Sequence, residues 1–241
     1  MVQNRKKKSL LLRWKNKFRK LLVATIASLF PFRWRKQSQN HWDNSWGNPD
    51  FSPLWGGREV AKEIVAAVES GWLPRGRSVL DIGCGRGEIA RWFAENAYPV
   101  VGVDIAQAAI DLARDDCKNM FAPPEFLALD ILSQSLPKRQ YGILIDRGCL
   151  HQISSWERKN YVKNIVAVSA PDARFMLFIK AFRDGCPLGD PKEWKQQTNW
   201  VKKTFAGNFT IERIEPTWLD RFYGKEPEKA LPGIVFWMTR T

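Results

Sequence analysis

One short segment combines an acid, three glycines and the predicted start of a helix. Residues 79–88 read VLDIGCGRGE. Asp81 stands near the end of the apolar run, and three alternating glycines follow it, at Gly83, Gly85 and Gly87. Glycines let a backbone turn sharply and approach a ligand, and a helix beginning at Glu88 would offer free N–H groups. A carboxylate two residues before a GxGxG turn suits a ligand with an ammonium group better than one with a pyrophosphate.

Two further acids follow apolar runs in the same way. Asp104 comes directly after VVGV, and Asp130 directly after FLAL. An acid at the tip of the second strand can accept both hydroxyls of an unphosphorylated ribose. Because doubly wound sheets bind ligands at the carboxyl ends of their strands, we expect Asp81, Asp104 and Asp130 to converge on one crevice.

The elements that would position these acids alternate between strands and helices. Strands are predicted at 78–82, 100–103, 125–128, 142–145 and 174–180. Helices are predicted at 59–70, 88–96, 107–117 and 156–169, the last with Ser154 or Ser155 as its N-cap. Such alternation indicates βαβ units and a mostly parallel sheet. A helix at 193–204, a strand at 210–214, an irregular stretch at 216–232 and an apolar run at 234–238 predict a closing hairpin.

The strings DIGCGRGE, GVDI and LALD resemble the motifs of class I S-adenosylmethionine-dependent methyltransferases, over about residues 45–240. The resemblance implies an α/β, Rossmann-like, seven-stranded, mostly parallel sheet with helices on both faces and a C-terminal antiparallel hairpin. It also implies S-adenosyl-L-methionine as cofactor, with the glycine loop around its methionine part, Asp104 at the ribose and Asp130 or its neighbour at the adenine amino group. The expected cofactor-binding residues are Asp81, Gly83, Cys84, Gly85, Gly87, Asp104, Ile105, Asp130, Ile131, Asp146 and Trp55. A nicotinamide enzyme and a non-enzymatic cofactor-binding scaffold are the alternatives.

Residues 141–153 carry the fourth strand and the loop that should lie below the reactive methyl. The string DRGCLHQI, with Arg158 after it and the aromatic segment 46–55 before it, resembles more weakly a branch containing thiopurine, thiol and halide methyltransferases. A small-molecule acceptor is therefore expected, with a thiol or other soft nucleophile first and a phenolic or quinone-like lipid second.

His151 and Asp146 are the predicted catalytic residues of this loop. An imidazole titrates near neutral pH, so His151 could act as a base for a phenol, or it could only support the loop. Asp146 and Arg147 could pair and hold the loop, and Cys149 is expected to fill space rather than act as a nucleophile. Trp46 and Trp55 could wall the sulfonium through cation–π contact.

The net charge of +13 belongs to one end of the chain. Residues 1–40 hold twelve Lys and Arg and no acid, whereas the remainder holds 26 bases against 25 acids. We therefore predict a basic arm over 1–40 and a methyltransferase domain over 41–241, with 41–57 as a loop or linker. The nearly neutral body argues against nucleic acid as a partner. No oligomeric state is specified by the sequence.

Apolar residues recur at three- and four-residue steps through 9–30, which predicts an interfacial helix ending at Pro31. As part of residues 9–36, this helix would attach a cytoplasmic enzyme peripherally to an anionic membrane. A signal peptide, a cleaved transit segment and an RNA-binding tail are the alternatives. The apolar stretch 21–32 is shorter than the roughly twenty residues of a spanning helix. Two histidines and four scattered cysteines predict no metal site and a reducing compartment.

Overall fold

The computed structural model describes residues 31–57, 59–133, 136–137, 140–180 and 189–241, with only the backbone for 31–34. Two compact units divide between His41 and Trp42, and Trp42–Thr241 contain the whole sheet. The predicted helix over 9–30 lies outside the described residues. No described helix has the length and apolar character needed to cross a membrane.

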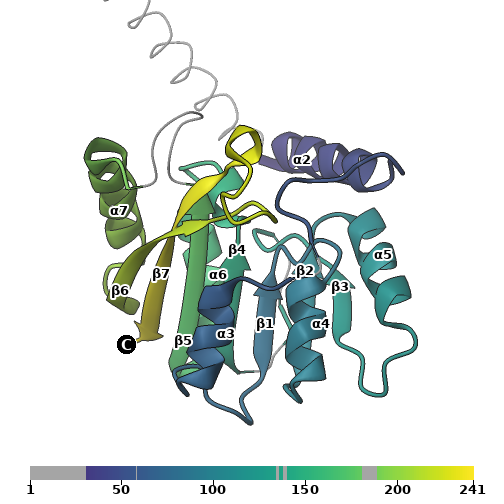
Figure 1. Ribbon diagram of the computed structural model, residues 1–241, viewed down its shortest axis with the longest axis horizontal. Helices are drawn as coiled ribbons and strands as arrows, with labels where there is room; N and C mark the ends of the chain where they lie inside the picture. The colour runs from purple at the N-terminus through teal and green to yellow at the C-terminus, as the bar shows by residue number, and fades with distance from the viewer. Residues whose placement is uncertain (1–30, 58, 134–135, 138–139, 181–188) are drawn as a thin grey trace, which may run out of the picture. The chain divides into compact units, whose positions relative to one another are not determined.

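Seven strands form one sheet in the order β3-β2-β1-β4-β5-β7-β6 (Figure 1). They are β1 (Val79–Ile82), β2 (Val100–Asp104), β3 (Glu125–Ala128), β4 (Tyr141–Arg147), β5 (Ser169–Lys180), β6 (Phe209–Trp218) and β7 (Pro232–Arg240). Strands β1 to β5 run parallel, and β7 pairs antiparallel with both β5 and β6. The expected mostly parallel sheet with an antiparallel C-terminal hairpin is confirmed.

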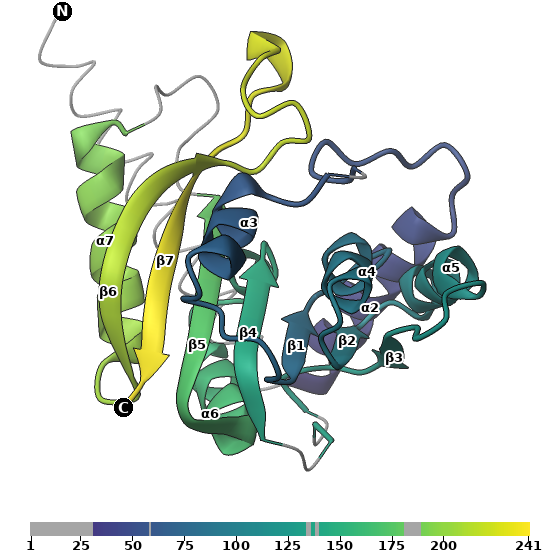
Figure 2. The same cartoon turned by 60° about the horizontal axis from the view of Figure 1, so that its bottom comes forward.

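Helices cover both faces of the sheet (Figure 2). One apolar core joins the sheet to α3 (Lys62–Glu69), α4 (Glu88–Glu95) and α5 (Gln107–Cys117). A second core joins the other face to α6 (Arg158–Val168) and α7 (Pro191–Phe205). Because strand side chains alternate, Leu80 and Ile82 enter the second core, whereas Val79 enters the first. Asp81 therefore faces α4.

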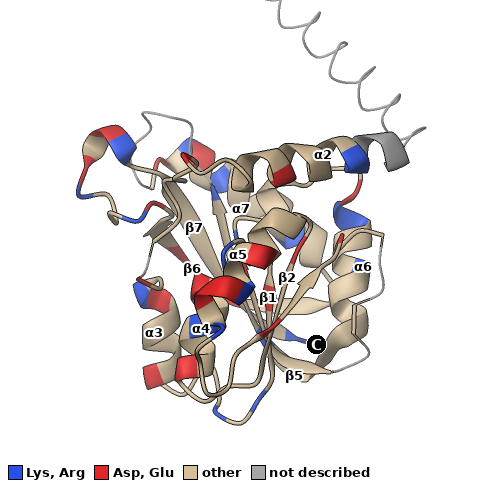
Figure 3. Cartoon of the chain, turned by 90° about the vertical axis from the view of Figure 1, so that its right-hand side faces the viewer, with Lys and Arg blue, Asp and Glu red and all other residues tan. Residues whose placement is uncertain are grey.

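The two helical layers carry opposite charges (Figure 3). Helices α3, α4 and α5 hold seven acids against three bases, whereas α6 holds three bases, Arg158, Lys159 and Lys163, and no acid. The loop after β4, which leads into α6, thus lies next to the basic layer.

The segment before the domain differs from its prediction. Helix α2 spans Pro31–Trp46, so His41–Trp46 are helical, and the loop predicted over 41–57 is wrong for these residues. Pro31 is the first described residue of this helix. The polar sequence of α2 has too little apolar periodicity to predict it.

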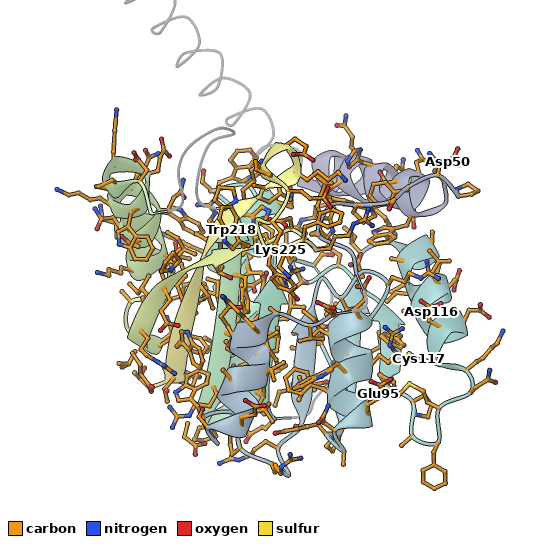
Figure 4. The ribbon with its side chains drawn as sticks, viewed as in Figure 1. Asp50, Glu95, Asp116, Cys117, Trp218 and Lys225 are labelled. Carbon is orange, nitrogen blue, oxygen red and sulfur yellow. The ribbon has the colours of Figure 1, made fainter. Side chains whose placement is uncertain are left out.

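Two boundaries later in the chain also need correction. Helix α6 begins at Arg158 with Glu157 as N-cap, because Ser154 instead closes a turn through its carbonyl, which accepts from Glu157 N at 2.9 Å. The stretch predicted as irregular over 216–232 begins later, since β6 continues to Trp218, and it includes a short 3-10 helix, η2 (Pro227–Lys229). Gly224, with a φ of 73°, folds this segment back onto the Trp218 ring. Figure 4 labels Trp218, at the end of β6, and Lys225, the residue after Gly224.

Candidate active site

The glycine turn between β1 and α4 forms a cradle that only glycine can line. Gly83, Gly85 and Gly87 all have positive φ, at 68°, 52° and 78°. A Cβ atom on Gly83 would lie 2.6 Å from Cβ of Cys149, one on Gly85 3.0 Å from the Trp46 ring, and one on Gly87 2.7 Å from the Phe126 ring. Side chains at these positions would also strain the left-handed backbone. Both the packing around the turn and its backbone conformation therefore require glycine at these three positions.

Gly83→Ala is expected to destabilise the domain more than Gly71→Ala. Both glycines have positive φ, at 68° and 75°, but a Cβ on Gly71 would meet nothing within 4 Å. The backbone penalty of about 1–2 kcal/mol is common to both, and overpacking against Cys149 should add about 1–3 kcal/mol at Gly83 alone. Urea unfolding of the two variants measures the difference. Equal losses would show that Gly83 and Cys149 are not in contact.

Asp81 is a buried carboxyl at the start of this cradle. Its side chain is 2% exposed, and Oδ2 accepts a hydrogen bond from Ala90 N, in the first turn of α4, at 3.1 Å. Burial, followed by the negative charge of Glu88, raises the pKa of Asp81 to about 8. A nearby ammonium group would favour the ionised form.

Binding of S-adenosylmethionine at pH 7 is therefore expected to release up to one proton from Asp81. A carboxyl with a pKa of about 8 is mostly protonated at this pH, and an arriving ammonium lowers that pKa. Calorimetry in buffers of different ionisation enthalpy measures the number of protons released. Asp81→Asn should abolish the buffer dependence, and a dependence unchanged in that variant would assign the proton to another group.

Asp104 joins the end of β2 to the glycine turn. Its Oδ2 accepts from Gly85 N and its Oδ1 from Ala106 N, both at 2.9 Å. Burial raises the pKa of Asp104. On the other side, Asp43 at the end of α2 accepts from Ala108 N in the first turn of α5 at 3.2 Å. The carboxylate of Asp104 is thus fixed beside Gly85, where its remaining lone pairs suit ribose hydroxyls.

Asp130 fixes the conformation of the segment that follows β3. Asp130 accepts from Leu132 N at 2.8 Å and from the Ser133 hydroxyl at 2.7 Å, which shapes a turn. The next residue, Ile131, is buried, and its carbonyl accepts from Asn164 at 2.6 Å. Contact of Asp130 or Ile131 with adenine stays a prediction, as does that of Ile105.

Asp146 organises the loop after β4 from a fully buried position. Oδ1 accepts from Gly148 N at 3.1 Å and from Cys149 N at 2.8 Å, and Oδ2 accepts from Leu150 N at 3.0 Å and from the Tyr161 hydroxyl at 2.5 Å. These bonds start the 3-10 turn η1 (Leu150–Gln152). Burial raises the pKa of Asp146 to about 6, although its hydrogen bonds oppose the rise. The side chain positions the loop.

The predicted pairing of Asp146 with Arg147 is wrong. The Arg147 guanidinium donates to the carbonyls of Trp55 at 2.9 Å and Leu219 at 2.6 Å. Successive residues of a strand point to opposite faces, so the two side chains diverge. Arg221 adds a bond from its N–H to the Leu54 carbonyl at 2.7 Å. Arg147 therefore connects two segments, 51–57 and 219–224, at the end of β4, a role that no sequence signal indicates.

Four aromatic rings gather beside the glycine turn. Trp46 meets Phe51, Phe51 meets Trp55, and Trp55 meets Trp42, all edge to face, with centroids 5.1–6.4 Å apart. The Trp46 ring lies against Gly85, whereas Trp55 is 39% exposed. The structure thus brings the predicted Trp46 and Trp55 into one cluster. Their contact with a sulfonium stays a prediction.

The loop after β4 also touches the glycine turn. Cys149, whose burial raises the pKa of its thiol, contacts Gly83. Cys84 is buried with its Sγ beside Gly102, so it fills space under the turn. His151 lies close to Gly148 and to the end of β5. Within the described ranges, no three His, Cys, Asp or Glu side chains are grouped to hold a metal ion.

The sequence of the chain is similar to those of known methyltransferases. A family model described as a methyltransferase domain matches residues 79–172. A 2-heptyl-1-hydroxyquinolin-4(1H)-one methyltransferase of Mycobacteroides abscessus is 29% identical over 128 residues, which are 53% of this chain and 56% of that enzyme. The chain thus matches little more than half of that relative. An uncharacterized methyltransferase of Schizosaccharomyces pombe is 30% identical over 107 residues, 44% of this chain and 72% of that protein.

A solved structure has the same fold. Magnesium protoporphyrin IX methyltransferase of Synechocystis PCC 6803, with bound S-adenosylmethionine, superposes with a TM-score of 0.60 at 17% identity, over 86% of this chain and 97% of that one. The sheet order, the glycine cradle and these matches lead to one assignment. The chain belongs to the class I S-adenosylmethionine-dependent methyltransferases.

Proposed function

We propose that the chain methylates a small organic acceptor. S-adenosylmethionine would be held by the glycine cradle, Asp81 and Asp104, and supplies a methyl group already activated on a sulfonium. The observation that carries the proposal is the clamp at Arg147, which holds segments 51–57 and 219–224 together at the carboxyl edge of the sheet. Long segments over this edge commonly enclose a small substrate.

An acidic oxygen or sulfur is the proposed methyl acceptor. The chain's own groups need only align the acceptor with the methyl and exclude water. A soft thiolate meets this requirement, and the resemblance to thiopurine and thiol methyltransferases favours it. The quinolone specificity named for the mycobacterial relative favours a phenolic or quinone-like oxygen. Both acceptor types belong in the same assay.

An acceptor screen with radiolabelled S-adenosylmethionine tests the proposal. Aromatic thiols, phenols, hydroxyquinolones and quinols form one arm, and RNA and protein extracts form the other. Label should transfer to a member of the first arm and disappear in Asp104→Ala. Label found only in RNA or protein would overturn the small-molecule proposal while leaving the family assignment intact.

We also propose that residues 9–36 attach the enzyme peripherally to an anionic membrane on its cytoplasmic side. The twelve bases without an acid in residues 1–40 support this, since each base near an anionic surface contributes up to about 1 kcal/mol. Phe30, Phe32 and Trp34 add apolar residues to the arm.

Vesicle co-sedimentation tests the attachment. One variant replaces five arm bases by Gln: Arg13, Lys15, Lys17, Arg19 and Lys20. A matched variant replaces five exposed bases of α6 and α7: Lys159, Lys163, Lys195, Lys202 and Lys203. Only the arm variant should lose binding to anionic vesicles. High salt should weaken the binding of the unmodified protein to these vesicles. Equal loss in both variants, or equal binding to neutral vesicles, would remove the membrane proposal.

A further inference from the structure

We propose that the acceptor is bound as an anion, and that His151 holds it as a hydrogen-bond donor through Nε2–H in a subsite shared with Lys180 and Arg158. The inference rests on the proposed methylation of a small acceptor and adds its ionisation state. It also replaces the general base predicted for His151 by a donor.

The hydrogen bond at Nδ1 fixes which nitrogen carries the proton. Nδ1 of His151 accepts the backbone N–H of Lys180 at 3.1 Å. A neutral imidazole has one nitrogen with a lone pair and one with a proton. Because the lone pair at Nδ1 is used by the strand, the proton stands on Nε2. Nε2 can therefore donate a hydrogen bond to the methyl acceptor, but it has no lone pair with which to take a proton from that acceptor.

The imidazole lies on the same edge of the sheet as the glycine turn. Cys149 contacts Gly83, as described above, and the neighbouring Gly148 donates to the Phe178 carbonyl at 3.1 Å. A Cβ on Gly148 would lie 3.3 Å from Cε1 of His151. The ring is therefore held between the loop after β4 and the end of β5. His151 follows Cys149, the residue that contacts the glycine cradle, by two positions.

Among the residues that the structure describes, the two charged groups that act on the imidazole are positive. They belong to Lys180 at the end of β5 and Arg158 at the start of α6. Burial, followed by these two charges, lowers the pKa of His151 to about 4. Arg158 is held in place, since its Nε donates to the Ile153 carbonyl at 3.3 Å and its guanidinium lies 3.9 Å from the centroid of the Trp200 ring.

The nearest acid on this loop offers no route for a proton. Both oxygens of Asp146 already accept hydrogen bonds from backbone N–H groups, and one also accepts from the Tyr161 hydroxyl. Positive charges that oppose a cationic imidazole stabilise an anion in the same place. The subsite therefore suits an acceptor that has already lost its proton.

The transfer step then involves no proton. The acceptor releases its proton to solvent before reaction, and its anion forms the new bond to the methyl carbon. The C–S bond of the sulfonium breaks with its electron pair remaining on sulfur, which yields the methylated acceptor and S-adenosylhomocysteine. Suitable acceptors are thiols and those phenols, enols and N-hydroxy heterocycles that ionise near neutral pH. Simple alcohols should react poorly.

NMR of the full chain tests the protonation state without any acceptor. The chain has two histidines, His41 and His151, so the His41→Gln variant leaves a single imidazole. Long-range ¹H–¹⁵N correlation spectra should show the Nε2–H form at pH 7 and no titration between pH 5.5 and 7.5, because the pKa is lowered to about 4. An Nδ1–H form, or an imidazolium appearing near pH 6.5, would overturn the donor assignment.

Two substitutions separate donor from base with an acidic phenol as acceptor. His151→Gln keeps an N–H near the position of Nε2 but cannot act as a base, whereas His151→Ala removes both functions. For a donor, kcat/KM should fall about 10–100-fold in the Ala variant, with most of the loss restored in the Gln variant. For a base, both variants should lose a similar factor of about 10²–10⁴.

The pH profile supplies the last discrimination. Across a series of substituted thiophenols and phenols, the rise of kcat/KM should follow the pKa of each acceptor. The profile is measured with S-adenosylmethionine at saturation, so that cofactor binding and the proton released by Asp81 do not contribute to it. Under this condition, an inflection at one fixed pH for every acceptor would identify an enzymatic base and overturn the inference. Label found only in macromolecules would instead refute the proposed function, while the NMR result would still decide the state of His151.

Discussion

Replacing Asp104 by Ala should weaken S-adenosylmethionine binding by about two to four orders of magnitude. The carboxylate fixes the glycine turn through Gly85 N and the start of α5 through Ala106 N. Its loss frees both N–H groups and also removes the predicted acceptor for two ribose hydroxyls. Hydrogen bonds to a charged group contribute about 1.5–3 kcal/mol each, so losing two or more gives this range. Titration calorimetry with S-adenosylmethionine measures the effect.

Asp111→Ala is the matched control on the next helix. Asp111 is exposed on α5, where it accepts a hydrogen bond from Gln107 at 2.8 Å. The Asp111→Ala variant should therefore bind the cofactor as tightly as the unmodified chain does. The affinity of Asp104→Asn, which keeps one acceptor oxygen, should lie between those of Asp104→Ala and Asp111→Ala. A folded Asp104→Ala protein with unchanged affinity would show that the ribose does not bind here.

Replacing Asp146 by Ala should lower the free energy of unfolding by about 3–5 kcal/mol, the cost of breaking a buried charged network. The substitution leaves the N–H groups of the β4 loop and the Tyr161 hydroxyl without their acceptor in a buried place. Because a domain is stabilised by only about 5–15 kcal/mol in total, unfolding should be followed in urea at low temperature.

Tyr161→Phe isolates one of these bonds. It removes only the hydroxyl, and Oδ2 of Asp146 still accepts from Leu150 N, so a loss of about 1–2 kcal/mol is expected. Equal destabilisation by the two substitutions would mean that the backbone bonds of Asp146 contribute little. In the Asp146→Ala protein the His151 resonances should also shift, since both residues belong to the same loop.

The strands and the three acids could be predicted because their signals are local. A short apolar run followed by an acid marks the carboxyl end of a parallel strand, and such ends share one edge of the sheet. The register places Ile82 opposite both Val103 and Asp146, so neighbouring strand ends do align. The glycines that follow Asp81 required a sharp turn, and positive φ is found at all three.

The remaining features depend on partners far away in the chain. The N–H that fixes the tautomer of His151 comes from Lys180, 29 positions later. The carbonyls bound by Arg147 are 92 and 72 positions away. No pattern within one segment encodes such pairs. The end of α2 also depends on a distant partner, because Asp43 accepts a hydrogen bond from Ala108 N at the start of α5.

The position of β7 has a consequence for the order in which the chain can assemble. This strand follows β6 in the sequence but lies between β5 and β6, so β6 has no neighbour in the sheet until β7 has been synthesised. Arg174 pairs with Thr239 across 65 positions, a closure that slows folding. Until then the edge of β5 stays open, and nascent chains at high concentration would be exposed to aggregation through that edge.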